Sequence, residues 1–163
     1  MKCFPFIFLF LLTGMPLVSA QDPGTESIGK MSVELIYATN GTAEDAGAGA
    51  KPLDESDVKI LQGVEELKFA QYRLLGSDVP DILKGYESWA TPLRPSKEIL
   101  VSFQPIKRDE ADKMQIVLEY WQGKRKIFST NPTLTKGKSF YLVGPKWRDG
   151  LVIISLKILS LEK

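Results

Sequence analysis

The second half of the chain is built from short segments in which apolar and polar residues alternate, separated by turn residues. In residues 97–104 and 114–120 every second side chain is apolar, which is the period of a strand with one buried face. Residues 151–159 are apolar almost throughout, which predicts a central strand covered on both faces. Short strands joined by short loops, without a long internal repeat, predict an antiparallel β-sandwich or a strongly curled sheet.

One segment, residues 53–76, has a different pattern. Its first part carries apolar residues at helical spacing: Ile60 or Leu61, Val64 and Leu67. Asp54 is a suitable N-cap, and the helical period is lost in residues 69–75 before Gly76. A helix that leads almost directly into a strand is therefore predicted, and its apolar stripe would give the sheet a surface to close over. The predicted fold class is α+β, mostly β, organised around one packed amphipathic helix.

Residues 1–20 have the pattern of a secretory signal peptide. Lys2 supplies a positive start, residues 4–12 form an apolar core too short to span a bilayer comfortably, and residues 18–20 are small enough for cleavage. The sequence therefore predicts an exported protein, periplasmic or extracellular. An uncleaved leader that tethers the protein to the membrane is the alternative.

Cleavage after residue 20 would leave 143 of the 163 residues, enough for one globular domain without disulfides. The polar residues 21–30 are expected to form a flexible leader, and residues 31–163 a single β-rich domain whose first strand covers 31–38. Within that domain, the small, glycine-rich segment 39–53 is expected to be a flexible loop.

The composition excludes several kinds of chemistry. Histidine is absent, and the single cysteine, Cys3, lies in the leader, so imidazole-dependent triads, thiol catalysis and thiolate–metal sites are not expected. The sequence also lacks a glycine-rich phosphate-binding motif. We therefore predict no catalytic residue, no cofactor and no metal site. Removal of Lys2 leaves 20 basic against 20 acidic residues, a balance that argues against nucleic acid as a partner.

A pair of carboxylates, as in glycosidases, is the catalytic arrangement that this composition still allows. Most acids that could serve lie in predicted turns, where solvation is the ordinary reason for them: Asp78, Asp81, Asp109, Glu110, Asp112 and Asp149. Glu119 lies instead on a predicted strand, where a surface charge is the ordinary interpretation. A carboxylate-based glycan hydrolase remains an alternative function, and it requires two inward acids across a cleft, one with a raised pKa.

A first group of candidate contact residues lies around a predicted hairpin. Tyr120 and Trp121 precede the turn, and Lys124, Arg125 and Lys126 follow it. Aromatic and basic side chains together can stack on a sugar or a nucleobase. The other interpretation is a cross-strand aromatic pair at a sheet edge, with lysines that discourage edge pairing.

A second group is Trp147 and Arg148, in the segment 144–150, which is predicted to be a loop. A large aromatic residue at a loop tip is a candidate for contact with a partner. Alternatively, Trp147 folds back onto the sheet.

Two stretches, KFAQYRLLGS (68–77) and KGKSFYLVGPKWRDGLVIISL (136–156), resemble a loose family of exported bacterial proteins. In that family a helix leads into a Y-R-L-L-G-S strand, and the chain closes on a G-P-K/R-x-x-x-G-x-L-I-I hairpin. The resemblance implies a bacterial exported protein with no assigned activity.

These observations favour a non-enzymatic secreted or periplasmic binding or structural module. As an accessory component of an envelope assembly, it would pair its edge strands with a larger partner. The expected partner is a protein of the cell envelope or a glycan.

Overall fold

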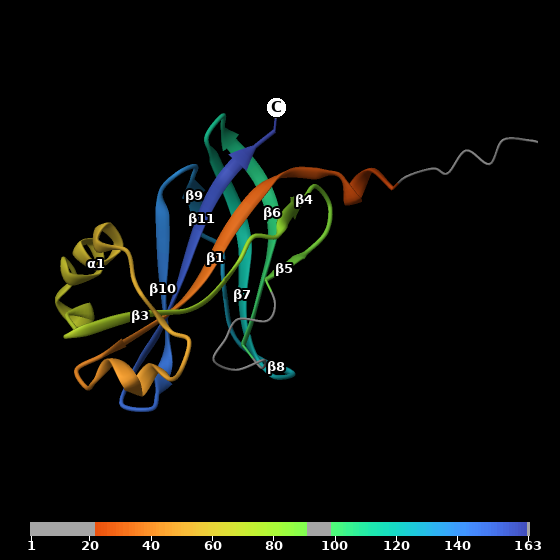
Figure 1. The fold of residues 1–163 in the computed structure, drawn as a ribbon. Helices are drawn as coiled ribbons and strands as arrows, with labels where there is room; N and C mark the ends of the chain where they lie inside the picture. The colour runs from red at the N-terminus through yellow and green to blue at the C-terminus, as the bar shows by residue number, and fades with distance from the viewer. Residues whose placement is uncertain (1–21, 91–98, 163) are drawn as a thin grey trace, which may run out of the picture.

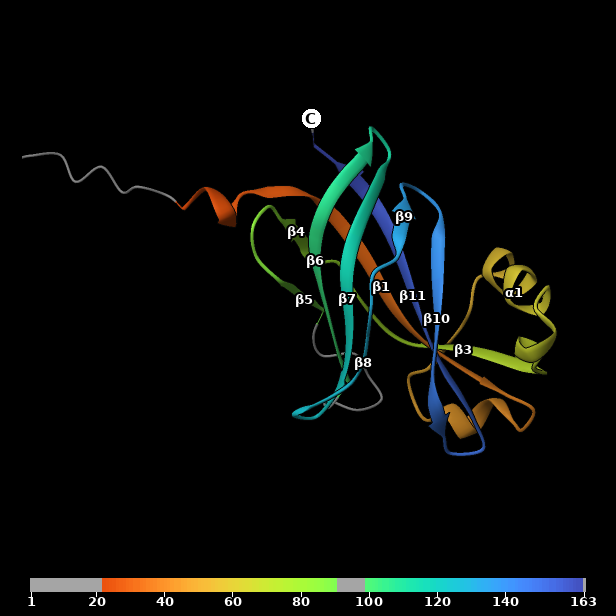
Figure 2. The ribbon, with the colours of Figure 1, turned by 180° about the vertical axis from the view of Figure 1, so that it is seen from behind.

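The computed structural model describes residues 22–90 and 99–162, which form two antiparallel sheets packed against each other (Figures 1 and 2). The first sheet contains β1 (Ser27–Thr39), β2 (Lys51–Pro52), β3 (Gln71–Asp78), β4 (Asp81–Leu83), β10 (Ser139–Trp147) and β11 (Gly150–Leu161). The second contains β5 (Ser88–Ala90), β6 (Ile99–Glu110), β7 (Lys113–Gln122), β8 (Arg125–Thr130) and β9 (Thr133–Thr135). One α-helix, α1 (Glu55–Gln62), and the 3-10 turns η1 (Pro23–Thr25), η2 (Ala43–Ala46) and η3 (Glu65–Leu67) complete this part of the chain. The predicted mostly β sandwich is confirmed.

The first sheet is arranged around the long pair β1–β11. The strand order is β10-β11-β1-β3-β2, and the β1–β11 register runs from Gly29 opposite Leu161 to Thr39 opposite Gly150. Alternate residues of β11 enter different layers: Ile154 lies between the sheets, whereas Ile153 lies on the outer face of the first sheet. The prediction of a strand covered on both faces is therefore confirmed.

The main core lies between the two sheets and is formed by alternate apolar residues of their long strands. Its largest contributions are Met31, Val33, Leu35 and Tyr37 from β1, Val101 and Phe103 from β6, Met114, Ile116, Leu118 and Tyr120 from β7, and Val152, Ile154, Leu156 and Ile158 from β11. Because β7 uses every second residue for this core, its remaining side chains face outward.

The helix covers the outer face of the first sheet and lies on the side away from β6 and β7 (Figures 1 and 2). Its N-cap is Asp54, as predicted, which accepts a hydrogen bond from the Ser56 backbone N–H at 2.8 Å. Gly63 is the C-cap that ends the helix. Leu61 is buried, but Ile60 and Val64 are exposed. The helix therefore covers a secondary cluster, and the expectation that it organises the fold is wrong.

Two prolines sit inside strands that were expected to stop there. β6 continues through Pro105 because β5 pairs with β6 only at 101–103, so the missing N–H of Pro105 costs no bond to β5. β10 continues through Pro145 on the edge of the first sheet, with an irregularity in register between Val143 and Lys146. The predicted loop 144–150 is therefore mostly strand, and Asp109 and Glu110, which were expected in a turn, lie in β6.

The segments expected to be flexible contain regular elements. β1 begins at Ser27, inside the predicted leader 21–30, and residues 22–26 bond to the segment after β4: the N–H groups of Lys84 and Gly85 donate to the carbonyls of Glu26 and Gly24. The predicted loop 39–53 contains η2 and β2. The predicted signal peptide, residues 1–20, lies outside the described residues.

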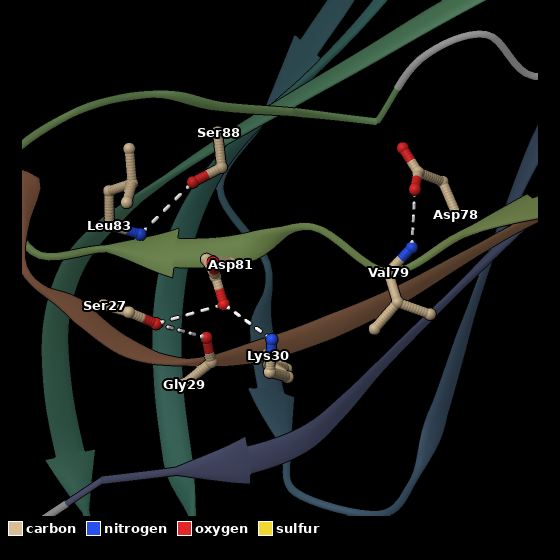
Figure 3. Close-up of polar contacts among 8 residues, drawn as sticks. All are labelled: Ser27, Gly29, Lys30, Asp78, Val79, Asp81, Leu83 and Ser88. Carbon is tan, nitrogen blue, oxygen red and sulfur yellow. Dashed lines mark hydrogen bonds and ion pairs between the residues drawn. The ribbon is translucent and has the colours of Figure 1, made fainter.

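The chain passes from the first sheet to the second between β4 and β5, and polar contacts of β4 hold this segment in place (Figure 3). Asp81 accepts hydrogen bonds from Ser27 Oγ at 3.2 Å and from Lys30 Nζ at 2.9 Å, which tie β4 to β1. At the other end of β4, the backbone N–H of Leu83 donates to the hydroxyl of Ser88 at 3.2 Å. Ser88 is buried on β5, so these contacts set the position of β5 on the second sheet.

Truncation of Ile154 tests the central position of β11. Ile154→Ala should lower the free energy of unfolding by about 2–5 kcal/mol, because a fully buried side chain leaves a cavity between the sheets. The matched control, Leu159→Ala, removes an exposed side chain of the same strand and should change it by less than about 1 kcal/mol. Urea denaturation measures both values, and equal losses would contradict the assignment.

Candidate functional site

The structure separates the two aromatic residues of the hairpin group. Neighbouring residues of a strand point to opposite faces, so Tyr120 enters the core and Trp121 faces outward. Tyr120 is buried and stacks on Phe128, with ring centroids 5.3 Å apart. Tyr120 is therefore a core residue, and its prediction as a contact residue is wrong. Lys124 and Arg125 are exposed at the β7–β8 turn.

Trp121 has a neighbour that the sequence did not indicate, Trp89 of β5. Their ring centroids lie 5.9 Å apart with planes tilted by 50°. The registers explain this contact, because Trp89 pairs with Ser102 of β6, and Ser102 pairs with Glu119 of β7. Trp89 is 39% exposed, and neither core cluster of the described residues lies over this face. Two indoles therefore pack side by side on the outer face of the second sheet.

Glu119 holds Trp121 in place. One carboxylate oxygen accepts the indole Nε1–H of Trp121 at 2.9 Å, and the other accepts Lys126 Nζ at 2.8 Å. The Lys126 ammonium also lies 5.7 Å from the centroid of the Trp121 ring. The hydrogen bond from Lys126 is the main cause that lowers the pKa of Glu119, and that from Trp121 acts in the same direction. An ionised, paired carboxylate suits positioning better than proton donation.

Polar groups continue beside the indoles. A hollow of about 50 Å³ is lined by Glu87, Ser102, Gln104, Val117 and Glu119. Gln104 donates its side-chain amide to the carbonyl of Gly85 at 3.3 Å, which fixes the amide plane. We call the surface formed by Trp89, Gln104, Glu119, Trp121 and Lys126, which lies over the buried Ser102, the tryptophan face.

The second predicted group, Trp147 and Arg148, lies on the other side of the molecule's core. Trp147 folds back onto the first sheet and meets the buried ring of Tyr37 edge to face, with centroids 5.2 Å apart. The guanidinium of Arg148 lies 4.1 Å from the Trp147 ring centroid, and its Nη1 donates to the backbone carbonyl of Asp45. Of the two interpretations of Trp147, the folded-back one is correct. Arg148 fastens the β10–β11 turn to η2.

A third polar group was not predicted as a site and lies on the outer face of the first sheet. The Tyr141 hydroxyl donates to Asp57 Oδ1 at 2.6 Å, which links β10 to α1. Burial is the main cause that raises the pKa of Glu34 on β1, and Asp57 adds to the effect, whereas Lys157 opposes it. Burial also raises the pKa of Tyr141. This group includes an acid with a raised pKa, the property that the hydrolase alternative requires.

The described residues show neither a metal-binding cluster nor a membrane-spanning helix. Within 22–90 and 99–162, no group of three or more acidic, histidine or cysteine side chains is placed to hold a metal ion. In the same ranges, the helices are too short or too polar to cross a bilayer.

The hydrogen bond between Glu119 and Trp121 predicts a pH-dependent signal. As the pH falls through the lowered pKa of Glu119, protonation removes the Lys126 ion pair and weakens the bond to the indole N–H. In a ¹H–¹⁵N spectrum, the Trp121 indole signal should shift with a midpoint below the ordinary glutamate value, while that of Trp147 should not. Glu119→Gln should abolish this titration. A midpoint above the ordinary value would contradict the pairing.

Comparison with known proteins adds no identification. A scan against protein-family models and searches of curated proteins and of solved structures find no match to this chain. The function is therefore inferred from the residues of this chain alone.

Proposed function

We propose that this protein is an exported, non-catalytic binding module whose contact surface is the tryptophan face. One observation carries the proposal: Trp89 and Trp121 lie side by side on a sheet face over which residues 22–90 and 99–162 place no core layer. Large aromatic residues dominate the energetics of recognition surfaces because they bury much apolar area with few rotatable bonds. Neither indole belongs to the two core clusters, so folding alone does not account for the pair.

The tryptophan face is held rigid before any ligand arrives. β6 and β7 pair along almost their whole length beneath it, and Glu119 fixes the Trp121 ring through its N–H. Lys126 from the next strand fixes Glu119 in turn. A surface that is already ordered loses little conformational entropy on binding, which favours affinity.

The edge strand β10 is poorly suited to pairing with another chain, which favours the tryptophan face as the contact surface. β10 is an edge of the first sheet, and its irregularity at 144–145, the Pro145 ring and the exposed Lys146 are features that discourage pairing with another chain. Binding through the tryptophan face requires no new backbone pairing at the edge strands.

Removal of either indole should strongly weaken binding to the envelope. The purified wild-type protein should sediment with an envelope fraction of its host, and Trp89→Ala and Trp121→Ala should sediment on the order of tenfold less. Ile60→Ala is the matched control, because Ile60 is an exposed apolar residue on α1, away from the tryptophan face. Circular dichroism checks that the variants stay folded. Equal sedimentation of all four proteins would reject the face as the contact surface.

One observation favours a second candidate function, the carboxylate-based glycan hydrolase. Glu34 combines a raised pKa with a neighbouring acid, Asp57. In the binding-module account this pKa reflects burial under α1 and has no catalytic role. Release of reducing ends from a polysaccharide by the wild type, lost in Glu34→Gln, would favour the hydrolase.

The same variant makes a stability prediction for the binding-module account. Because burial raises the pKa of Glu34, its ionisation costs stability in the folded state as the pH rises from the ordinary glutamate value through the raised one. Glu34→Gln should therefore be more stable than the wild type at neutral pH, and the difference should shrink below the ordinary glutamate pKa. Thermal unfolding between pH 3 and 8 measures this difference, for which Glu66→Gln, an exposed acid, is the control. A less stable variant at neutral pH would contradict burial as the cause.

A further inference from the structure

We propose that the ligand of the tryptophan face is a neutral polysaccharide chain, an inference that rests on the binding function proposed above. The exposed Trp89 ring supplies the stacking surface. One face of a sugar ring presents C–H groups, whereas its hydroxyls point outward, so a sugar can cover an indole while its hydroxyls bond to polar neighbours. Trp121 supports Trp89 from the side at 5.9 Å and is itself held by Glu119.

The residues of the tryptophan face form rows that run across the strands, and successive rows are spaced along the strand direction. Trp89 of β5 and Glu119 of β7 lie in one row, with the buried Ser102 of β6 between them. Gln104 and Val117 form the next row on the same face, and Trp121 with Lys126 the row on the other side. Rows on one face are two residues apart, roughly 7 Å. Three rows offer contact along roughly 14 Å, which matches an extended chain better than a single sugar.

The shape of the face also points to a chain. Pockets that enclose a small molecule measure roughly 300–1,000 Å³, whereas the hollow beside Trp89 measures about 50 Å³. A monosaccharide would find no enclosure there. A polymer instead gathers its binding energy from several contacts along an open surface.

The charges of the face favour a neutral polymer over an acidic one. Lys126 is paired with Glu119, so this ammonium and carboxylate largely cancel. The other charged residue lining the hollow is Glu87, which would repel an anionic chain but accept hydrogen bonds from sugar hydroxyls. Lys124 and Arg125 lie at the β7–β8 turn, beyond the end of the rows. Among the described residues, the face presents no row of cations of the kind that the phosphates of a nucleic acid require.

Affinity electrophoresis in native gels tests this inference. The gels contain hydroxyethyl cellulose, mixed-linkage β-glucan, xylan or galactomannan as neutral probes, and alginate, polygalacturonate or single-stranded DNA as anionic ones. At least one neutral polymer should retard the wild-type protein. Trp89→Ala should weaken that binding on the order of tenfold, Trp89→Phe less, and Ile60→Ala should behave as the wild type.

Several results would overturn the inference. Retardation by the anionic probes alone, or retardation by a neutral polymer that Trp89→Ala leaves unchanged, would contradict it. Absence of retardation in all gels would also overturn it, and sedimentation with the envelope then separates the two proposals. If sedimentation still depends on Trp89 and Trp121, the binding module stands and its ligand is not a neutral polysaccharide. If it does not, both proposals fail.

Discussion

The antiparallel pair of β1 and β11 is the constraint on which the rest of the structure depends. These strands are buried on both faces, so each must supply apolar side chains at successive positions, as in Leu35 and Ile36 or in Ile153 and Ile154. Backbone groups buried in this way are paired on both sides, which β10 and β3 accomplish as the neighbouring strands. The second sheet then covers one face, and α1 with its flanking turns covers the other.

This division explains why the second sheet has a free face. Its inner side chains complete the main core, and no element of the described chain lies in a core layer over its outer side. The outer positions of β6 and β7 therefore lie outside the two core clusters and can carry polar residues and tryptophans, with Ser102 buried beneath them. The Glu119–Lys126 pair contributes little as a surface ion pair, but it sets the orientation of Trp121.

Much of the fold could be predicted from local patterns, and the failures have physical causes. Alternation of residues identified β7, which has one buried face, and the nearly continuous apolar run of 151–159 identified β11, which is buried on both faces. Proline was a poor marker of strand ends, since Pro105 and Pro145 occupy positions where no neighbouring strand needs their N–H. The structural importance of α1 was overestimated, because the spacing of apolar residues indicates that a helix forms but not how much of the core it covers.

The candidate site was harder to predict because it depends on contacts between distant strands. Strand alternation alone places Tyr120 inside with Leu118 and leaves Trp121 outside. Trp89 carries no such signal: β5 has three residues, and only its pairing with β6 brings the ring to Trp121. The folded-back position of Trp147 likewise depends on Tyr37, far away in the sequence.

Native-state hydrogen exchange measures most directly whether the β1–β11 pair supports the structure. The account predicts that amides of β1 and β11 exchange only through global unfolding, while those of α1, β4 and β5 exchange through smaller local openings. If the slowest amides lay in α1 instead, the helix would be the organising element. The central claim would then be contradicted.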